Sequence, residues 1–396
     1  MKAVVTLNSG SSSIKFALFD LDHGRHLALS AGGKIERIGI APRLEIHSGD
    51  GALLSRHEWP DQSEHTHDEL LAWLFDWIGT HLEGREVIAV GHRVVHGGTD
   101  FARPCLVDDI VLGELERLCP LAPLHQPHNL AAIRTIARLV PDLAQIACFD
   151  TAFHHDRPAL TTRFAIPREL HDQGIRRYGF HGLSYDYIAR RLAELDPQMA
   201  AGRVIVAHLG NGASLCAMAG GKSLDTSMGF TALDGLMMGT RSGTIDPGVI
   251  LYLQNETGMS AQDVEHMLYH RSGLLGVSGI SSDMRTLTES SAPEAAEAID
   301  LFVWRAAREA AALAASLGGV DGIVFTAGIG ENDANVRSRI CRRLDWLGVE
   351  VNEIANAAND PVISLPSSRV KVRVIPTDEE HMIALHTLAI LFGGTA

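Results

Sequence analysis

Short β-branched runs that end in glycine- or serine-rich loops recur along this chain. Residues 3–7 and 14–19 flank a turn of small residues at 8–13, and residues 204–207 and 213–218 flank a glycine turn at 208–212. Each pair predicts an antiparallel hairpin. The second pair follows about two hundred residues after the first. Two related halves would produce this pattern, although two independent hairpins would produce it as well.

Three further runs predict strands that lead into loops: 87–90 before 91–98, 145–149 before 150–154, and 322–325 before 326–332. An alanine-rich helix is expected at 293–317, with a capping box of Ser291 and Glu294 and an end at Gly318. Residues 370–375 and 379–391 predict a strand followed by a helix. Strands that alternate with helices indicate an α/β fold. No flexible linker divides the chain, so any domain boundary is expected to be a short crossover. The best position for this boundary is near Thr151.

The composition excludes several classes of protein. Lys and Arg total 34 against 48 Asp and Glu, for a net charge of −14, which is unsuited to binding a nucleic-acid backbone. No apolar run approaches the roughly 20 residues of a membrane span, and the N-terminus lacks the features of a signal peptide. The five cysteines are scattered without a CxxC, so we expect free thiols in a cytoplasmic protein and no zinc site.

Several loops have the residue types that bind phosphate. The turn at 9–13 offers backbone N–H groups, hydroxyls and the nearby Lys15, and the turn at 210–212 is rich in glycine. Either could also be an ordinary hairpin turn. Residues 328–332 follow a strand and could approach a nucleotide, or could form a tight turn with Asn332 as a helix N-cap. No GxxxxGK[ST] occurs, so any nucleotide is held by another fold.

Some charged residues stand in loop contexts that suit catalysis. Arg93 and Arg241 lie among small residues, where an arginine fork can bind an oxyanion or form a surface ion pair. Asp150 ends a strand and could be a catalytic acid or a helix N-cap. With 20 histidines in the chain, any single one is more often ordinary than catalytic, and His154 is expected to be solvated. Glu379 opens the last helix, either as a dipole partner or as a magnesium contact.

The ordered set of these segments resembles the acetokinase family over essentially the full length of the chain. The matching segments are 8–15 (NSGSSSIK), 91–98 (GHRVVHGG), 122–125 (APLH), 149–154 (FDTAFH), 178–182 (YGFHG), 207–214 (AHLGNGAS), 237–243 (MMGTRSG), 282–285 (SDMR) and 325–332 (FTAGIGEN). The resemblance implies two duplicated actin-like/ribonuclease H-like α/β domains with a nucleotide cleft between them. It also implies a homodimer that uses ATP, a short-chain carboxylate and Mg²⁺ or Mn²⁺.

The resemblance further implies a division of labour and a role for each matching residue. Residues 1–150 plus 381–396 would form an N-terminal half that binds the acid, and residues 151–380 a C-terminal half that binds nucleotide and dimerises. The implied catalytic residues are Arg93, Asp150, His181 and Arg241, and the implied acid-binding residues are Arg93, Val95, Leu124 and Phe180. The implied nucleotide-binding residues are Ser11, Ser12, Lys15, His125, His208, Gly210, Asn211, Gly212, Asp283, Met284, Arg285, Gly328, Ile329, Gly330 and Asn332. Asn8 and Glu379 would bind the metal.

The expected reaction is reversible, direct in-line phosphorylation of acetate by ATP. A carboxylate with a pKa of roughly 4–5 is already ionised at pH 7 and needs no general base, so positive charge and orientation are the main requirements. We therefore expect Arg93 to bind the carboxylate, Arg241 and His181 to stabilise the transition state, and Asp150 to orient Arg93 or metal-bound water.

The chain departs from the family pattern at a few positions. Ala232 replaces a proline and could enlarge the acid pocket, which leaves open a propionate or butyrate kinase of the same family. Leu183 and Tyr185 are atypical after His181, Gln126 replaces an asparagine, and Asp378 replaces an asparagine beside Glu379. An actin-like ATPase that forms no acyl phosphate is a more distant alternative, because Arg93 and Arg241 would have no purpose there.

Overall fold

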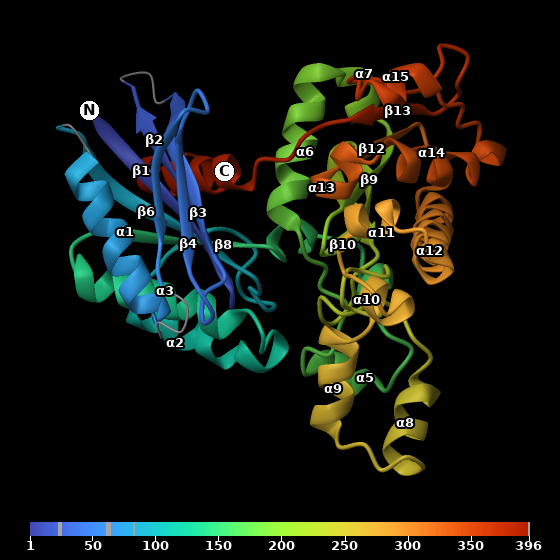
Figure 1. The fold of residues 1–396 in the computed structure, drawn as a ribbon, viewed down its shortest axis with the longest axis horizontal. Coiled ribbons are helices and arrows are strands. Elements are labelled where there is room, and N and C mark those ends of the chain that lie inside the picture. The colour runs from blue at the N-terminus through green and yellow to red at the C-terminus, as the bar shows by residue number, and fades with distance from the viewer. Residues whose placement is uncertain (23–25, 61–64, 82–83, 395–396) are drawn as a thin grey trace. The chain divides into compact units, whose positions relative to one another are not determined.

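The computed structural model describes residues 1–22, 26–60, 65–81 and 84–394 of the chain. It contains two compact units, which Figure 1 shows as ribbons coloured along the chain. Unit 1 comprises Met1–Ala152 together with Asp378–Ala396, and unit 2 comprises Phe153–Thr377. The C-terminal helix therefore returns to the unit that contains the N-terminus.

Unit 1 is built on an eight-stranded sheet of order β5-β4-β3-β2-β1-β6-β8-β7. The strands are β1 (Lys2–Ser9), β2 (Ser13–Leu21), β3 (Leu27–Glu36), β4 (Arg43–Ser48), β5 (Leu53–Glu58), β6 (Glu86–Val94), β7 (Cys105–Leu106) and β8 (Ala144–Phe149). The helices are α1 (His67–His81), α2 (Asp109–Arg117), η1 (Cys119–Leu121), α3 (Gln126–Leu139) and α16 (Glu379–Phe392).

Helices cover both faces of this sheet, and the alternation of side chains along β1 shows how. Val5 and Leu7 are buried in one apolar cluster with residues of α1 and α3. Val4 points the other way and packs with Leu388 of α16. Because successive residues of a strand face opposite sides of the sheet, a strand buried on both faces is almost continuously apolar, as the run at 3–7 is apart from the buried Thr6.

Unit 2 is built on a five-stranded sheet of order β11-β10-β9-β12-β13. Its strands are β9 (Arg203–Leu209), β10 (Ala213–Ala219), β11 (Lys222–Thr226), β12 (Gly322–Thr326) and β13 (Lys371–Val374). Helix α6 (Gly182–Leu195) packs on one face through Tyr185 and Ile188, and α12 (Pro293–Leu317) contacts β9, β10 and β11. The other helices are η2 (Ala152–His154), α4 (Ala159–Thr162), α5 (Arg168–Asp172), α7 (Pro197–Ala200), α8 (Pro247–Asn255), α9 (Ala261–His270), α10 (Gly273–Ser278), α11 (Met284–Glu289), α13 (Ala327–Asn332), α14 (Ala334–Arg342), η3 (Asp345–Leu347) and α15 (Glu353–Ala357).

The two sheets share one strand order, which confirms the predicted α/β fold of two related halves. In unit 1 the order β3-β2-β1-β6-β8 combines an antiparallel hairpin with the parallel strands β1, β6 and β8. In unit 2 the order β11-β10-β9-β12-β13 does the same with β9, β12 and β13. The carboxyl ends of parallel strands share an edge of the sheet, where α/β proteins bind ligands.

Two local predictions were wrong. The N-cap of α12 is Ala292, which makes no side-chain cap hydrogen bond. Since the helix begins with Pro293, its third residue is Ala295, so Ser291 and Glu294 are out of step for a capping box. The second concerns one of the two alternatives for residues 328–332: Asn332 is not an N-cap but the last residue of α13, and Asp333 is the N-cap that precedes α14 and accepts a hydrogen bond from Val336 N–H.

No helix in the described part of the chain is both long enough and apolar enough to cross a membrane.

Candidate active site

A buried arginine–aspartate pair lies at the ends of the parallel strands of unit 1. Arg93 near the end of β6 donates from Nε to both carboxylate oxygens of Asp150 at 3.1 Å and from Nη2 to Oδ2 at 2.6 Å. Its Nη1 donates to Oδ1 of Asn8 at 3.1 Å. Asp150, immediately after β8, is 1% exposed. The fold thus brings together three residues predicted to act at one site, and fixes the orientation of the guanidinium.

The electrostatics of this pair keep Arg93 charged. Burial by itself would lower the pKa of the Arg93 guanidinium, but Asp150 and then Glu379 and Glu380 act against it and raise the pKa above its usual value. Glu379, the first residue of α16, is therefore close enough to interact with this cluster. The result is a permanent positive charge surrounded by carboxylates, with oxygen donors beside it.

The loop after β6 is held almost entirely by side chains. Backbone N–H groups of Val95, His96 and Gly97 donate to Oδ1 of Asn129, Oε1 of Gln126 and Oγ1 of Thr151, each at 3.0 Å. Nδ2 of Asn129 donates to the Ser9 carbonyl oxygen at 2.6 Å, so one amide links this loop to the β1–β2 turn. The predicted acid-binding residue Val95 is buried, while Leu124 and His125 are half-buried just before α3.

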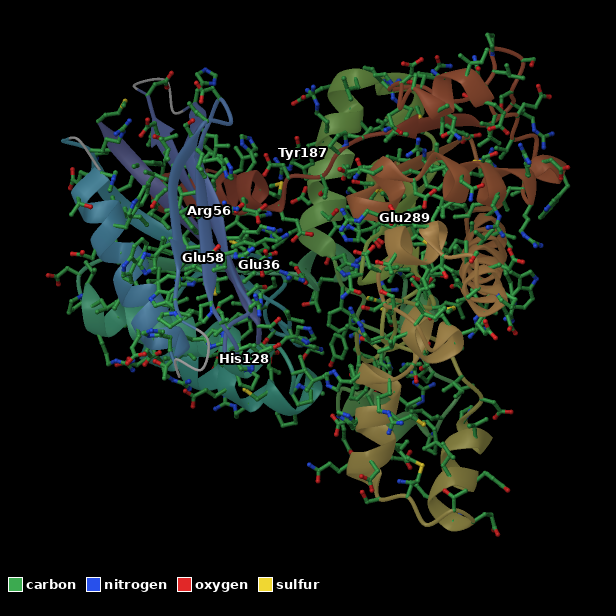
Figure 2. All side chains as sticks on the ribbon, viewed as in Figure 1. Glu36, Arg56, Glu58, His128, Tyr187 and Glu289 are labelled. Carbon is green, nitrogen blue, oxygen red and sulfur yellow. The ribbon has the colours of Figure 1, made fainter. Side chains whose placement is uncertain are left out.

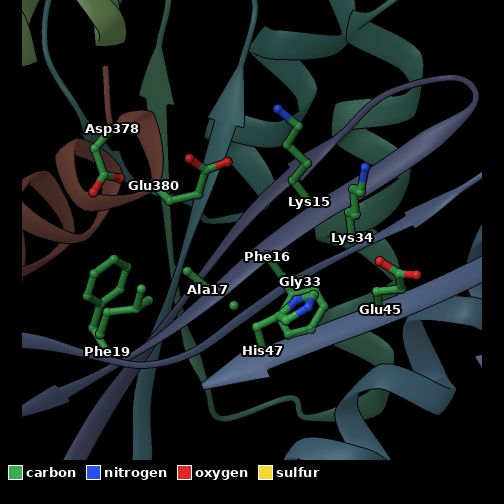
Figure 3. A pocket seen from close by; sticks show the side chains of 12 residues that line it. Lys15, Phe16, Ala17, Phe19, Gly33, Lys34, Glu45, His47, Asp378 and Glu380 are labelled. Atoms are coloured by element: carbon green, nitrogen blue, oxygen red, sulfur yellow. The ribbon is translucent and has the colours of Figure 1, made fainter. Parts of the chain in front are cut away.

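The β1–β2 turn presents its hydroxyls and its lysine to solvent, since Ser11, Ser12 and Lys15 are exposed. Lys15 lines a cavity of about 330 Å³ in unit 1, which Figure 3 shows against β2, β3 and β4. Glu380 lines the same cavity, and burial followed by the neighbouring Glu379 raises the pKa of its carboxyl, while Lys15 acts in the opposite direction. Lysine and carboxylates from two distant parts of the chain therefore share this cavity.

A larger cavity of about 810 Å³ lies in unit 2 and is lined by three segments far apart in the sequence. Residues predicted to bind nucleotide that line it are Gly210, Asn211, Asp283, Met284, Arg285, Gly328, Ile329 and Asn332. Ser282, Thr288, Glu289, Asp333 and Ala334 complete the lining; Glu289, at the end of α11, is labelled in Figure 2. The volume is within the range of roughly 300–1,000 Å³ that is usual for small-molecule and cofactor sites.

The turn between β9 and β10 has close neighbours that explain its last glycine. A Cβ added at Gly212 would lie 2.7 Å from Nη2 of Arg241 and 3.3 Å from Nε2 of His181. These two predicted catalytic residues therefore converge beside the turn, and any larger residue at 212 would displace them. Arg241 is held from the other side, since its Nη1 donates to the Ala232 carbonyl oxygen at 2.6 Å.

His181 and His208 stack on each other with ring centroids 4.3 Å apart. His181 precedes α6 with a positive φ of 58°, which is uncommon for a non-glycine residue. Its Nδ1 lies 2.8 Å from Oγ of Ser214, and Nδ1 of His208 lies 2.8 Å from Oγ of Ser184. Both rings are thus fixed by serine hydroxyls of unit 2.

His154 was predicted to be solvated, and this prediction was wrong because His154 is 1% exposed. Its Nε2 lies 3.0 Å from the carbonyl oxygen of Phe180 and its Nδ1 lies 2.7 Å from Oγ of Ser223. Burial, followed by the charge of Arg157, lowers the pKa of His154 to about 3. His154 is therefore neutral and holds the 178–181 loop through a hydrogen bond to its backbone. The predicted acid-binding residue Phe180 is itself buried in this loop.

The predicted site residues fall into two groups, one in each unit. Unit 1 contains Asn8, Ser11, Ser12, Lys15, Arg93, Val95, Leu124, His125, Asp150 and Glu379, and unit 2 contains Phe180, His181, His208, Gly210, Asn211, Gly212, Arg241, Asp283, Met284, Arg285, Gly328, Ile329, Gly330 and Asn332. The sequence analysis gave no role to Asn129. The available signal was a polar side chain on the otherwise apolar face of a helix. The sequence analysis also missed Tyr185 and Ser214 as partners of His181.

Comparison with known proteins decides the family. The sequence matches the acetokinase family over residues 3–385. The chain belongs to the acetokinase family. The chain is 51% identical to the acetate kinase of Methylocella silvestris, over 98% of both chains, and 52% identical to that of Rhodopseudomonas palustris strain CGA009, over 99% of both.

Solved structures of related proteins agree with this. The chain has a TM-score of 0.89 to a propionate kinase from Francisella tularensis, at 38% identity, covering 98% of this chain and 99% of that one. It has a TM-score of 0.87 to the acetate kinase of Porphyromonas gingivalis, at 36% identity, covering 99% and 100%. The duplicated actin-like α/β fold implied by the sequence resemblance is therefore confirmed.

Proposed function

We propose that this chain is an acetate kinase, which transfers the γ-phosphoryl group of ATP directly and reversibly to a carboxylate to form acetyl phosphate. The observation that carries the proposal is the 810 Å³ cavity of unit 2, because Gly210 and Asn211 of the glycine turn line one space together with residues of α11 and α13. These are the segments that the family resemblance assigns to the phosphates and the adenosine. The near 50% identity to acetate kinases supports acetate as the acceptor.

The chemistry follows from charge. Acetate is already an anion at neutral pH, so the enzyme needs no base but must bring two anions together. Arg93 provides a partly buried guanidinium that pairs with the carboxylate of Asp150 and donates to the amide oxygen of Asn8, and it can also bind the substrate carboxylate. Arg241 and His181 converge beside Gly212, where they can donate to the phosphoryl oxygens as charge develops.

Asp150 fits a positioning role in this scheme. Its carboxylate accepts from two nitrogens of Arg93 and is 1% exposed. A carboxylate occupied in this way orients the guanidinium, whereas a general base would have to face the acid. We therefore assign Asp150 to the orientation of Arg93.

The residues beside Arg93 fit a magnesium ion. Asn8 and Glu379 supply oxygen donors, which Mg²⁺ prefers, and Mg²⁺ in kinases is bound by few protein ligands together with waters and phosphates. The described residues contain no group of three or more His, Cys, Asp or Glu side chains placed to bind a metal, which agrees with a site completed by the nucleotide. When bound, the ion would neutralise charge on the phosphates.

Three further proposals come from the family and the composition. We propose a homodimer, in keeping with the family resemblance. We propose a cytoplasmic location, which the five free cysteines support. We also propose that the acid pocket uses Val95, Leu124 and Phe180, all three of them fully or partly buried.

Propionate is the alternative acceptor, and one observation favours it. Ala232 stands where the family usually has proline, and its carbonyl oxygen binds Arg241, so its small side chain lies next to the catalytic machinery. A structural neighbour is a propionate kinase. Because a pocket discriminates one methylene group by only about 1–3 kcal/mol, both acids are candidates for turnover.

Trapping the acyl phosphate as a hydroxamate tests the proposal. The enzyme is incubated with MgATP and acetate, propionate or butyrate, and hydroxamate and ADP are measured together. We expect hydroxamate equal to ADP with acetate as the preferred acid. ADP without hydroxamate would indicate an ATPase and reject the kinase. A higher kcat/KM with propionate would replace acetate as the substrate and keep the reaction type.

A further inference from the structure

The hydroxyl of Tyr185 lies in a buried chain of hydrogen bonds that ends at His181. Tyr185 follows His181 by one helical turn, and its backbone N–H donates to the His181 carbonyl oxygen at 3.1 Å. His181 is the N-cap of α6 and Tyr185 lies in its first turn, and both side chains reach β10. There, Oγ of Ser214 lies 2.8 Å from Nδ1 of His181 and 2.5 Å from the Tyr185 hydroxyl oxygen.

Because these groups are buried, the direction of each hydrogen bond follows from which atoms carry protons. Tyr185 and Ser214 are both 0% exposed, and His181 is 9% exposed. A buried hydroxyl that donates to nothing is costly, and among the described residues Ser214 is the hydrogen-bond partner found for the Tyr185 hydroxyl. Burial raises the pKa of Tyr185 well above its usual value, so the phenol keeps its proton. Tyr185 therefore donates to Ser214.

The remaining proton of the chain is then assigned. Ser214 has one hydroxyl proton, and with its oxygen accepting from Tyr185 this proton points to Nδ1 of His181. A nitrogen that accepts carries no proton, so in the neutral ring the proton is on Nε2. The reverse order would leave the buried phenol proton of Tyr185 without an acceptor, and a Ser214 oxygen that accepted from both neighbours would leave its own buried proton without one. The stack on His208 at 4.3 Å also favours a neutral ring, because two adjacent imidazolium cations would repel.

We propose that Tyr185 is a positioning residue of this enzyme, which acts through Ser214 to hold the proton of His181 on Nε2. Nε2 is the nitrogen beside Gly212 and Arg241, so it faces the glycine turn as a hydrogen-bond donor. Only the last step, donation to the transferring phosphoryl group, rests on the proposed function.

The tautomer can be measured in the resting enzyme by ¹⁵N NMR of the full-length protein labelled at histidine, with the His181 signals assigned by their loss in His181→Gln. In the wild type we expect Nδ1 to have the shift of an unprotonated nitrogen and Nε2 that of a protonated one. Tyr185→Phe removes the hydroxyl and keeps the ring. We expect the variant to show a mixture of the two tautomers, because Ser214 is then free to accept from Nδ1–H.

Kinetics give the second readout. We expect Tyr185→Phe to lower kcat by about fivefold to tenfold, the effect of one neutral hydrogen bond, and to leave the KM for the acid unchanged. Tyr187→Phe is the matched control, since Tyr187, labelled in Figure 2, is half-buried on the same helix two residues further on, where it faces another direction. Tyr187→Phe should preserve both tautomer and kcat.

Two outcomes would overturn the proposal: a wild-type His181 protonated on Nδ1, or a Tyr185→Phe variant that keeps the single Nε2–H tautomer and the wild-type kcat. If Tyr185→Phe does not fold, Ser214→Ala breaks the same link from β10 and is judged by the same two measurements. Failure of the kinase proposal is distinguishable, because a wild type that forms no acyl phosphate would still report its His181 tautomer.

Discussion

Replacing Asp150 with asparagine tests whether this carboxylate orients an arginine or removes a proton. Asparagine has nearly the same shape but lacks the negative charge, and its NH₂ group cannot accept from a guanidinium. Arg93 would lose at least one of its contacts to Asp150, which measure 2.6–3.1 Å, and would keep its contact with Asn8. The guanidinium would remain charged and partly uncompensated.

The structure sets the size of the effect. Removing one partner of a buried ion pair costs about 3–5 kcal/mol. The Arg93 side chain is 20% exposed and keeps Asn8, so the lower part of this range applies. If about 2–3 kcal/mol of the cost falls on the transition state, kcat/KM for the acid decreases by about 30-fold to 150-fold.

The assay is the hydroxamate rate of wild type and Asp150→Asn between pH 6 and 9. An orienting carboxylate predicts the same loss at every pH, because the substrate is already ionised and there is no proton for hydroxide to remove. Asp20→Asn is the matched control. It breaks the Asp20–Arg85 pair of unit 1, which measures 2.8 Å. The Arg85 side chain is 20% exposed, as that of Arg93 is, whereas Asp20 at 17% is more exposed than Asp150. The change should lower stability without changing the rate.

Recovery of the Asp150→Asn rate as the pH rises would refute this reasoning, because hydroxide would then be replacing a lost base. An unchanged rate at all pH values would refute it as well, since Arg93 would not depend on its partner.

Three more predictions concern stability and the glycine turn. Arg337→Met removes five hydrogen bonds of a fully buried guanidinium, two of them to backbone carbonyls of α13. It should lower the free energy of unfolding in urea by about 3–5 kcal/mol and weaken ATP binding measured by calorimetry. Gly212→Ala should lower kcat by about tenfold or more with little loss of Tm, because its Cβ displaces flexible side-chain ends. Burial lowers the pKa of His92 and His96 to about 4 and that of His154 to about 3. Below about pH 6.5 the unfolded chain therefore binds more protons at these residues than the folded chain does. The stability that the three residues contribute above this pH is lost on acidification, by up to about 1.4 kcal/mol per pH unit for each residue. A free energy of unfolding that does not decrease from pH 6.5 to 4.5 would contradict the prediction for these three histidines.

The sequence determined the elements and the family of this protein. Apolar runs, turn residues and helix ends are local signals, so the two hairpins, β8, β12 and the long helix α12 were predicted close to their observed bounds. The strand predicted at 87–90 extends to Val94 as β6 and includes Arg93, and most of the loop predicted at 326–332 forms α13. The signature segments identified the family because their order along the chain is visible without a structure. Errors arose where one residue of register matters, as at the start of α12 and at Asn332.

Only the tertiary structure decided how the site residues are held. Asn129 binds the Ser9 carbonyl oxygen across 120 positions of sequence, and Arg93 binds Asp150 across 57. Tyr185 gains its role because β10 places Ser214 between it and His181. His154, a plausible surface residue by its neighbours, is buried by a loop and a strand that come later in the chain. The physical reason is common to all four: a side chain's protonation and orientation depend on partners brought by folding, and no local pattern contains them.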